Sequence, residues 1–215
     1  MSREFKSFYK TVGGGEGQKC HYPTRLDTYG CGCQHDCSYC YAKSLLYFRK
    51  QWHAKDPAVA NINDIKKVID QIPAGTILRL GGMTDCFQPL EKEVRNTYKT
   101  IQLLNKRRIG YLIVTKSAMV ADDEYMEIMD KELAHIQISI TMTDDELCAK
   151  YEHASLPSER IKAIEKLAAA GFDVTVRLSP LIPGLYDPAI INAIVCDKLL
   201  VEFLRNDAWT KKWNR

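Results

Sequence analysis

Apolar residues recur at two different spacings along most of this 215-residue chain, and the two spacings alternate. Short apolar runs typical of buried strands lie at 76–80, 111–115, 135–141, 173–178 and 198–203. Before and between them, apolar positions at helical spacing predict helices at 41–52, 63–72, 91–106, 122–132, 158–170 and 188–195. This alternation implies an α/β fold, in which right-handed crossovers build a parallel sheet.

Polar residues end or follow four of the expected strands. They are Gly81-Gly82-Met83-Thr84-Asp85, Lys116-Ser117, Thr141 and Ser179-Pro180. Ligands of parallel α/β sheets bind at the carboxyl ends of the strands. We therefore expect these residues to line one binding site.

The two ends of the chain differ from its middle. Residues 1–20 show no clear periodicity and contain a glycine-rich run at 13–17, so we expect a flexible arm before a core domain of residues 21–205. Residues 206–215 form a tail that mixes tryptophans with basic residues. Such a tail suits either packing through its tryptophans or contact with nucleic acid.

The composition is that of an ordinary globular domain, with 46% hydrophobic and 27% charged residues. No apolar run is long enough to cross a bilayer, and the first residues lack the apolar segment of a signal peptide. We therefore expect a cytoplasmic protein without a membrane partner. The net charge of +3 is too small to imply a nucleic-acid partner by itself.

Four of the eight cysteines stand within ten residues, at Cys31, Cys33, Cys37 and Cys40. Thiolates are the ligands that iron–sulfur clusters and zinc prefer. The last three, spaced C-x3-C-x2-C, can hold a four-iron cluster whose fourth iron stays open to a substrate or cosubstrate. A structural zinc site that uses all four thiolates is the alternative.

The C-x3-C-x2-C spacing, with the aromatic Tyr39 before its last cysteine, resembles the radical S-adenosylmethionine enzymes. Further stretches resemble the spore photoproduct lyase-like branch of that group: GMTDCFQPLE at 82–91, VTKS at 114–117, QISIT at 137–141 and RLSPLIPG at 177–184. The resemblance covers roughly residues 21–205. It implies a partial (β/α)6 TIM-like barrel, the radical SAM core.

The same resemblance implies two cofactors. Cys33, Cys37 and Cys40 would hold a 4Fe-4S cluster, and S-adenosylmethionine would bind its open iron. An electron from the cluster would break the sulfonium carbon–sulfur bond, giving a 5′-deoxyadenosyl radical that abstracts hydrogen from a substrate. We expect a reductant such as flavodoxin or ferredoxin as partner, and nucleic acid is the substrate expected by analogy with this branch.

The resemblance also assigns contacts to S-adenosylmethionine. The residues concerned are Tyr39, Gly81, Gly82, Thr84, Asp85, Lys116, Ser139, Arg177, Leu181 and Ile182. Lys116 would pair with the carboxylate, and the two glycines would allow close backbone approach to the methionine moiety. Four of these residues also have a structural alternative: Lys116 as a solvated side chain, Asp85 as a cap, Ser139 as an inward polar residue bonded to the backbone, and Arg177 as an ion-pair partner.

The sequence departs from the spore photoproduct lyases at one position. Those enzymes carry a cysteine before the Thr/Ser-Ser-Asp turn, where it returns hydrogen to the product, and the corresponding residue here is Gly82. Cys86 is the thiol nearest in sequence and is either a replacement donor or a small packing residue. Tyr41 is either a radical-relay tyrosine or a packing residue. We therefore predict an activity other than efficient spore photoproduct repair.

Two other functions fit the sequence. One is a radical enzyme that modifies a peptide or a small molecule. The other is a non-catalytic module with a four-cysteine zinc site. Metal content would separate the module from both enzymes.

Overall fold

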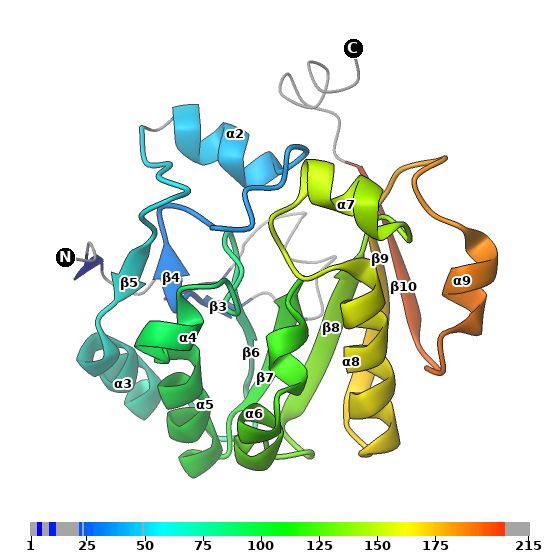
Figure 1. Ribbon diagram of the computed structural model, residues 1–215. Coiled ribbons are helices and arrows are strands. Elements are labelled where there is room, and N and C mark those ends of the chain that lie inside the picture. Colours follow the sequence, from blue (N-terminus) through cyan, green and yellow to red (C-terminus); the bar gives the residue numbers. More distant parts are fainter. Residues whose placement is uncertain (1–3, 6–8, 12–21, 23, 49, 205–215) are drawn as a thin grey trace.

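The computed structural model describes residues 4–5, 9–11, 22, 24–48 and 50–204 (Figure 1). Its main sheet has the strand order β10-β9-β8-β7-β6-β3-β2. The strands are β2 (Tyr9–Thr11), β3 (Thr24–Leu26), β6 (Ile77–Leu80), β7 (Gly110–Thr115), β8 (Ala134–Ile140), β9 (Asp173–Leu181) and β10 (Leu199–Phe203). All neighbours from β3 to β10 pair in parallel, and only β2 is antiparallel. The predicted α/β fold with a partial (β/α)6 barrel is confirmed.

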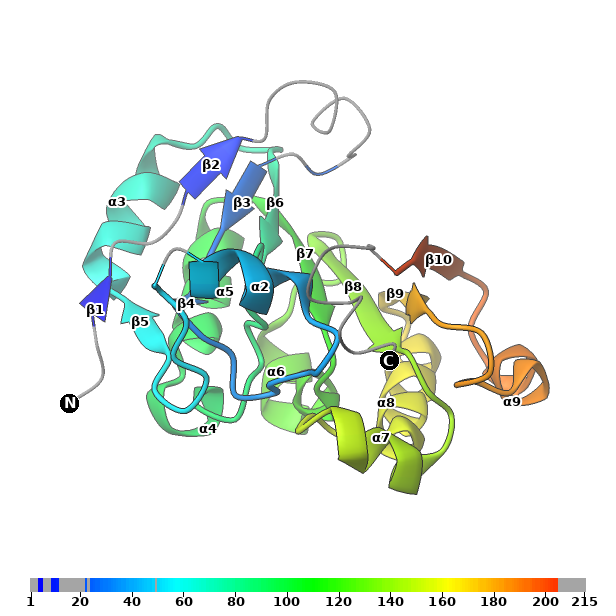
Figure 2. The same ribbon diagram turned by 90° about the horizontal axis from the view of Figure 1, so that it is seen from above.

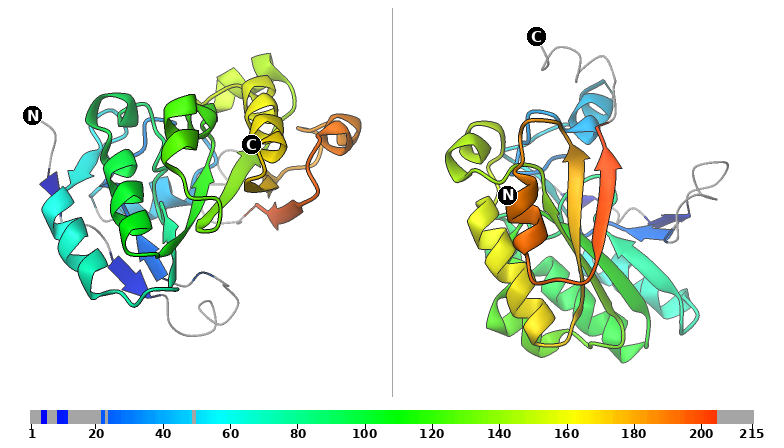
Figure 3. Two further views of the ribbon diagram at one scale, coloured as in Figure 1. Left: turned by 90° about the horizontal axis from the view of Figure 1, so that it is seen from below. Right: turned by 90° about the vertical axis from the view of Figure 1, so that its right-hand side faces the viewer.

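Helices cover the outer face of this curved sheet (Figures 1 and 3). They are α3 (Ile62–Gln71), α5 (Asn96–Lys106), α6 (Asp123–Ile128) and α8 (Pro157–Ala169), with α9 (Pro188–Ala193) beside β9 and β10. The residues that face these helices alternate along the strands and are almost fully buried, as Leu78, Leu80, Ile136 and Ile138 illustrate. The hydrophobic core therefore lies between the helices and the sheet, and the concave face is left for polar residues.

A second, smaller sheet joins β1 (Glu4–Phe5), β5 (Ala58–Ala60) and β4 (Tyr29–Gly30). Two strands, β1 and β2, lie within the segment that we expected to be a flexible arm, and both pair with strands of the core. The arm therefore contributes strands to both sheets. The glycine-rich run at 13–17 and the tail at 206–215 lie outside the described residues.

The helix expected at 91–106 is two helices, α4 (Glu91–Val94) and α5, separated at Arg95, whose φ is +57°. The cause is the fully buried carboxylate of Glu91. It accepts hydrogen bonds from the N–H groups of Thr97 and Tyr98, both at 2.9 Å, in the first turn of α5. A carboxylate in this position satisfies amides that the helix itself leaves unpaired.

Other boundaries differ less. Helix α2 (Tyr41–Phe48) is shorter than expected, a 3-10 turn, η1 (Ala118–Ala121), precedes α6, and helix α7 (Asp145–Tyr151) was not predicted. No helix of the described residues is long and apolar enough to cross a membrane.

Candidate active site

A cavity of about 200 Å³ lies at the carboxyl ends of the parallel strands. Helix α2 lies over these strand ends (Figure 2). Cys33, Cys37 and Cys40 all line it, on the loop that precedes α2. Cys31 is not among the lining residues. The cavity therefore brings together the three cysteines of the C-x3-C-x2-C motif at the edge of the sheet that the sequence indicated.

Backbone and amide hydrogen bonds hold the cysteine loop from two sides. On one side Gln34 accepts from the N–H of Leu90 at 2.6 Å and donates its own N–H to the side chain of Gln88 at 2.9 Å. On the other side the N–H of Ser38 donates to the carbonyl of Tyr151 at 2.9 Å, at the end of α7. Each of these contacts spans more than fifty residues of sequence, so the barrel fixes the loop in addition to the loop's own turn bonds, Asp36 N–H to Cys33 O and Cys40 N–H to Cys37 O.

The thiols of Cys33 and Cys37 are buried. Among the described residues, no three His, Cys, Asp or Glu side chains converge on one metal-ion position, so the four-cysteine zinc clamp is not preformed. Burial raises the pKa of Cys33 to about 12 and that of Cys37 well above its usual value. In the cluster-free protein these groups are neutral thiols, and binding iron would release their protons.

Lys116 is not a solvated lysine. Only 14% of its side chain is exposed, and Nζ donates to Thr141 Oγ1 at 2.8 Å and to Glu152 Oε1 at 3.0 Å. Burial, together with the positive charge of Arg160, lowers the pKa of Lys116 to about 7. The ammonium lies 5.3 Å from the ring centre of Tyr39, whose hydroxyl donates to Thr141 at 3.1 Å and also to Glu152.

Glu152 is the centre of this network. Its side chain is fully buried, and its two oxygens face Lys116 and the guanidinium of Arg160. Arg160 is also fully buried and donates to the backbone carbonyls of Ser139 at 3.0 Å and Ser155 at 2.7 Å. One carboxylate thus compensates two cations, of which Lys116 lines the cavity.

Asp85 lines the cavity but is held by protein groups. Its carboxylate accepts from Thr115 Oγ1 at 2.8 Å and from the N–H groups of Lys116 at 2.7 Å and Phe87 at 2.8 Å. Burial alone would raise its pKa, but His35, 3.3 Å away, and these hydrogen bonds lower it. The capping role is therefore present, and Asp85 fixes the turn against β7. Its neighbour Thr84 also lines the cavity.

The two glycines of the turn have different surroundings. Gly81 has φ +77°, and a Cβ there would lie 2.7 Å from the carbonyl oxygen of Thr84. A Cβ on Gly82 would lie 2.5 Å from Cδ of Arg25. The space of a side chain at position 82 is thus taken by an arginine from β3.

Ser139 and Arg177 lie side by side on neighbouring strands and line the cavity together. Arg177 donates to Gln137 at 2.6 Å and forms an ion pair with Glu202, so its predicted structural alternative is present. Tyr39 and Tyr41 also line the cavity, from the cysteine loop and the first residue of α2.

Three predicted site residues do not line the cavity. Leu181 packs against the main core, and Ile182 packs against the cluster that contains Tyr39 and Cys37. Cys86 is 1% exposed within the core beneath the turn, where burial raises its thiol pKa well above the usual value. Its proposed role as a hydrogen donor has no geometric support, and the packing alternative describes it.

Sequence reasoning missed Glu152 and Arg160. Arg160 did leave a signal, because it occupies the same face of α8 as the buried Ala163, Ile164 and Leu167. A charged residue on the apolar face of a helix needs a buried partner. Glu152 follows α7, which was not predicted, and no spacing pointed to it.

Comparisons with known proteins agree with this geometry. The uncharacterized protein MJ0683 of Methanocaldococcus jannaschii is 30% identical over 161 residues, which cover 73% of this chain and 60% of that protein. A mutant spore photoproduct lyase with bound AdoMet (S-adenosylmethionine) and dinucleoside spore photoproduct superposes with a TM-score of 0.66 and 19% identity, over 90% of this chain and 60% of the lyase. The protein anSMEcpe with bound AdoMet gives a TM-score of 0.57 and 12% identity, over 84% and 49%.

The structural likenesses, at these identities, show the shared fold. The chain spans about 60% or less of the length of these relatives. A family model of the radical SAM superfamily matches residues 28–194. Since this match covers most of the chain and includes the cysteine loop and the carboxyl ends of β6, β7, β8 and β9, the protein belongs to the radical SAM superfamily.

Proposed function

We propose that the protein reductively cleaves S-adenosylmethionine and uses the resulting 5′-deoxyadenosyl radical to abstract hydrogen from a substrate. The observation that carries the proposal is the meeting of Cys33, Cys37 and Cys40 with Lys116 in one cavity. The superfamily implies a 4Fe-4S cluster and AdoMet, and these three thiols would hold the cluster. Bound there, the cluster would supply the electron for carbon–sulfur cleavage, taken from a reductant such as flavodoxin or ferredoxin.

The chain's own residues support this proposal because they hold the ammonium group of Lys116 in place in the cavity. Lys116 is held by Thr141 and Glu152, so its ammonium does not need to be ordered when a carboxylate arrives. Thr84 and Ser139 line the same cavity and are suited to the ammonium or the ribose. These side chains project from the ends of paired strands, and the sheet fixes their positions relative to one another.

The test is anaerobic reconstitution with iron and sulfide, followed by measurement of 5′-deoxyadenosine with dithionite and AdoMet. Lys116→Ala removes one charge-assisted contact, which is worth about 1.5–3 kcal/mol, so AdoMet should bind about tenfold to a hundredfold more weakly. The matched control is Lys67→Ala, since the Lys67 side chain is 76% exposed on α3. Absence of 5′-deoxyadenosine from protein that has bound its cluster would contradict the function, and unchanged affinity in Lys116→Ala would contradict the role of the lysine.

We further propose that the substrate is a nucleic acid other than spore photoproduct. The fold shared with lyases that bind dinucleoside spore photoproduct supports the first part. The glycine at position 82 supports the second part, because it leaves no thiol at this position to return hydrogen to the product. Incubation of the reconstituted enzyme with a dinucleotide spore photoproduct should give uncoupled 5′-deoxyadenosine and little thymine, whereas efficient repair would contradict this assignment.

A further inference from the structure

Three arginines reach the cavity or its border from the strands of the main sheet: Arg25 on β3, Arg79 on β6 and Arg177 on β9. Arg177 has a carboxylate partner, Glu202. Arg25 and Arg79 form no ion pair with another of the described residues, and Nε of Arg79 is buried there without a hydrogen-bond partner. Two of the three guanidinium groups therefore have hydrogen-bonding capacity that the described part of the chain leaves unused.

These two arginines are neighbours. Arg25 and Arg79 are register partners on adjacent parallel strands, which places their Cα atoms about 4.8 Å apart. The Arg25 side chain passes over Gly82, with Nη1 3.3 Å from where a Cβ would lie. Arg79 and Gly82 line the cavity that the cysteine loop also lines, and Arg25 reaches its border through its contact with Gly82.

The charge beside the pair is only partly compensated. Asp27 is the nearby carboxylate on which both arginines act, and its Oδ1 also accepts the N–H of Gly82. Among the described residues, two guanidinium groups against one carboxylate leave an excess of positive charge at this wall. An excess charge in a partly dry cavity attracts an anionic group of a ligand.

We propose that Arg25 and Arg79 bind a phosphate group of the substrate. A planar carboxylate is satisfied by the fork of one guanidinium, whereas a tetrahedral phosphate presents oxygens in several directions and can engage two. Two arginines on adjacent strands therefore fit phosphate better. The inference rests on the proposed function, since it takes this cavity to be the place where the substrate binds, and it adds phosphodiester recognition to that function.

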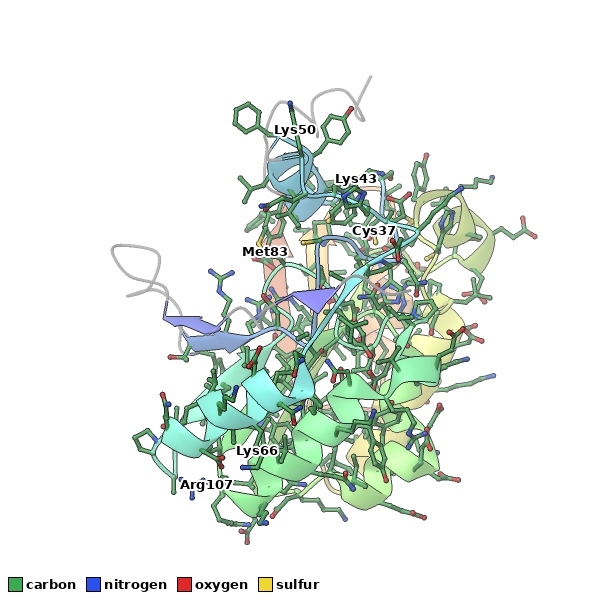
Figure 4. All side chains as sticks on the ribbon, turned by 90° about the vertical axis from the view of Figure 1, so that its left-hand side faces the viewer. Cys37, Lys43, Lys50, Lys66, Met83 and Arg107 are labelled. Atoms are coloured by element: carbon green, nitrogen blue, oxygen red, sulfur yellow. The ribbon has the colours of Figure 1, made fainter. Side chains whose placement is uncertain are left out.

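The first experiment is calorimetric titration of the anaerobically reconstituted protein with inorganic phosphate at low ionic strength. We expect one saturable site that weakens at least tenfold in Arg25→Gln and in Arg79→Gln, because each loses a charge-assisted contact. Arg79→Lys keeps the charge without the fork and should fall between wild type and Arg79→Gln. The control is Arg107→Gln, since Arg107 is exposed and lies at the end of the molecule far from Cys37 (Figure 4). Absence of a saturable site, or a site that survives both glutamine substitutions, would overturn the proposal.

The second experiment identifies the source of the phosphate. Thymidylyl-thymidine should bind at least tenfold more tightly than its uncharged methylphosphonate analogue, and Arg79→Gln should abolish this difference. Equal affinity of the two analogues, or tighter and arginine-dependent binding of an acidic dipeptide, would overturn phosphodiester recognition. Formation of 5′-deoxyadenosine by the wild-type enzyme without substrate is measured separately, so failure of the proposed function is distinguishable from failure of the phosphate site.

Discussion

Replacement of Glu152 by glutamine tests the charge network that supports the cavity. The Glu152 carboxylate is fully buried between two cations, Lys116 at 3.0 Å and the fully buried Arg160. Glu152→Gln keeps the size and one oxygen of the side chain but removes the negative charge. Arg160 cannot lose its proton, so it would remain charged in a dry environment without a counter-ion.

The expected loss of stability is large. Breaking a buried ion pair by removing one partner typically costs about 3–5 kcal/mol. Lys116, whose pKa is already lowered to about 7, can shed its proton and relieve part of this penalty, which places the expectation near 3 kcal/mol. A domain has about 5–15 kcal/mol of stability in total, so the variant should fold with a visibly reduced margin.

Urea unfolding of the cluster-free protein, followed by tyrosine and tryptophan fluorescence, measures this loss. The matched control is Glu132→Gln, which breaks an ion pair to Arg108 in which Glu132 is 79% exposed, and which should cost at most about 1 kcal/mol. A cost below about 1 kcal/mol for Glu152→Gln, or equal costs for the two variants, would refute the reasoning.

Three further predictions concern single residues. Cys37→Ala should abolish the brown colour and the iron content of reconstituted protein, whereas Cys31→Ala should retain about four irons per chain, as iron analysis will show. Burial raises the pKa of Asp27 to about 6, so the native state holds a proton that the unfolded state has lost between about pH 4 and pH 6. The free energy of unfolding therefore falls as pH rises through that window. In urea unfolding, the wild type should lose about 1 kcal/mol relative to Asp27→Asn between pH 5 and pH 7.5. Lys50 is exposed and has φ +55° after α2, so Lys50→Gly should stabilise the protein by about 0.5–1 kcal/mol, seen as a raised melting temperature.

The strand and helix order was predictable because each main element carries its own hydrophobic period. Interruptions of a helix that are caused by distant residues were not predictable. The interruption at Arg95 depends on Glu91, whose carboxylate is held in turn by the hydroxyl groups of Tyr29 and of Tyr125 at 2.7 Å. These partners lie 62 and 34 residues away, so the local sequence of the helix contains no sign of them.

For the candidate site, too, local patterns were predictable and long-range contacts were not. Residues in motifs or at strand ends, such as Cys37, Lys116 and Ser139, were found because the parallel sheet brings strand ends to one edge. Glu152 was missed because its role comes from long-range contacts with Lys116 and Arg160. Arg25 was missed because β3 is only three residues long, too short for a periodic signal.

The backbone links between the cysteine loop and the end of α7 have a consequence for protein engineering. Ser38 donates to the carbonyl of Tyr151, and the N–H of His153 donates to the carbonyl of His35 at 2.8 Å. These two bonds lie on either side of Glu152, so the backbone of the cysteine loop is tied directly to the 151–153 segment. A cysteine loop grafted onto another barrel would therefore keep its shape only if the 151–153 segment were transferred with it.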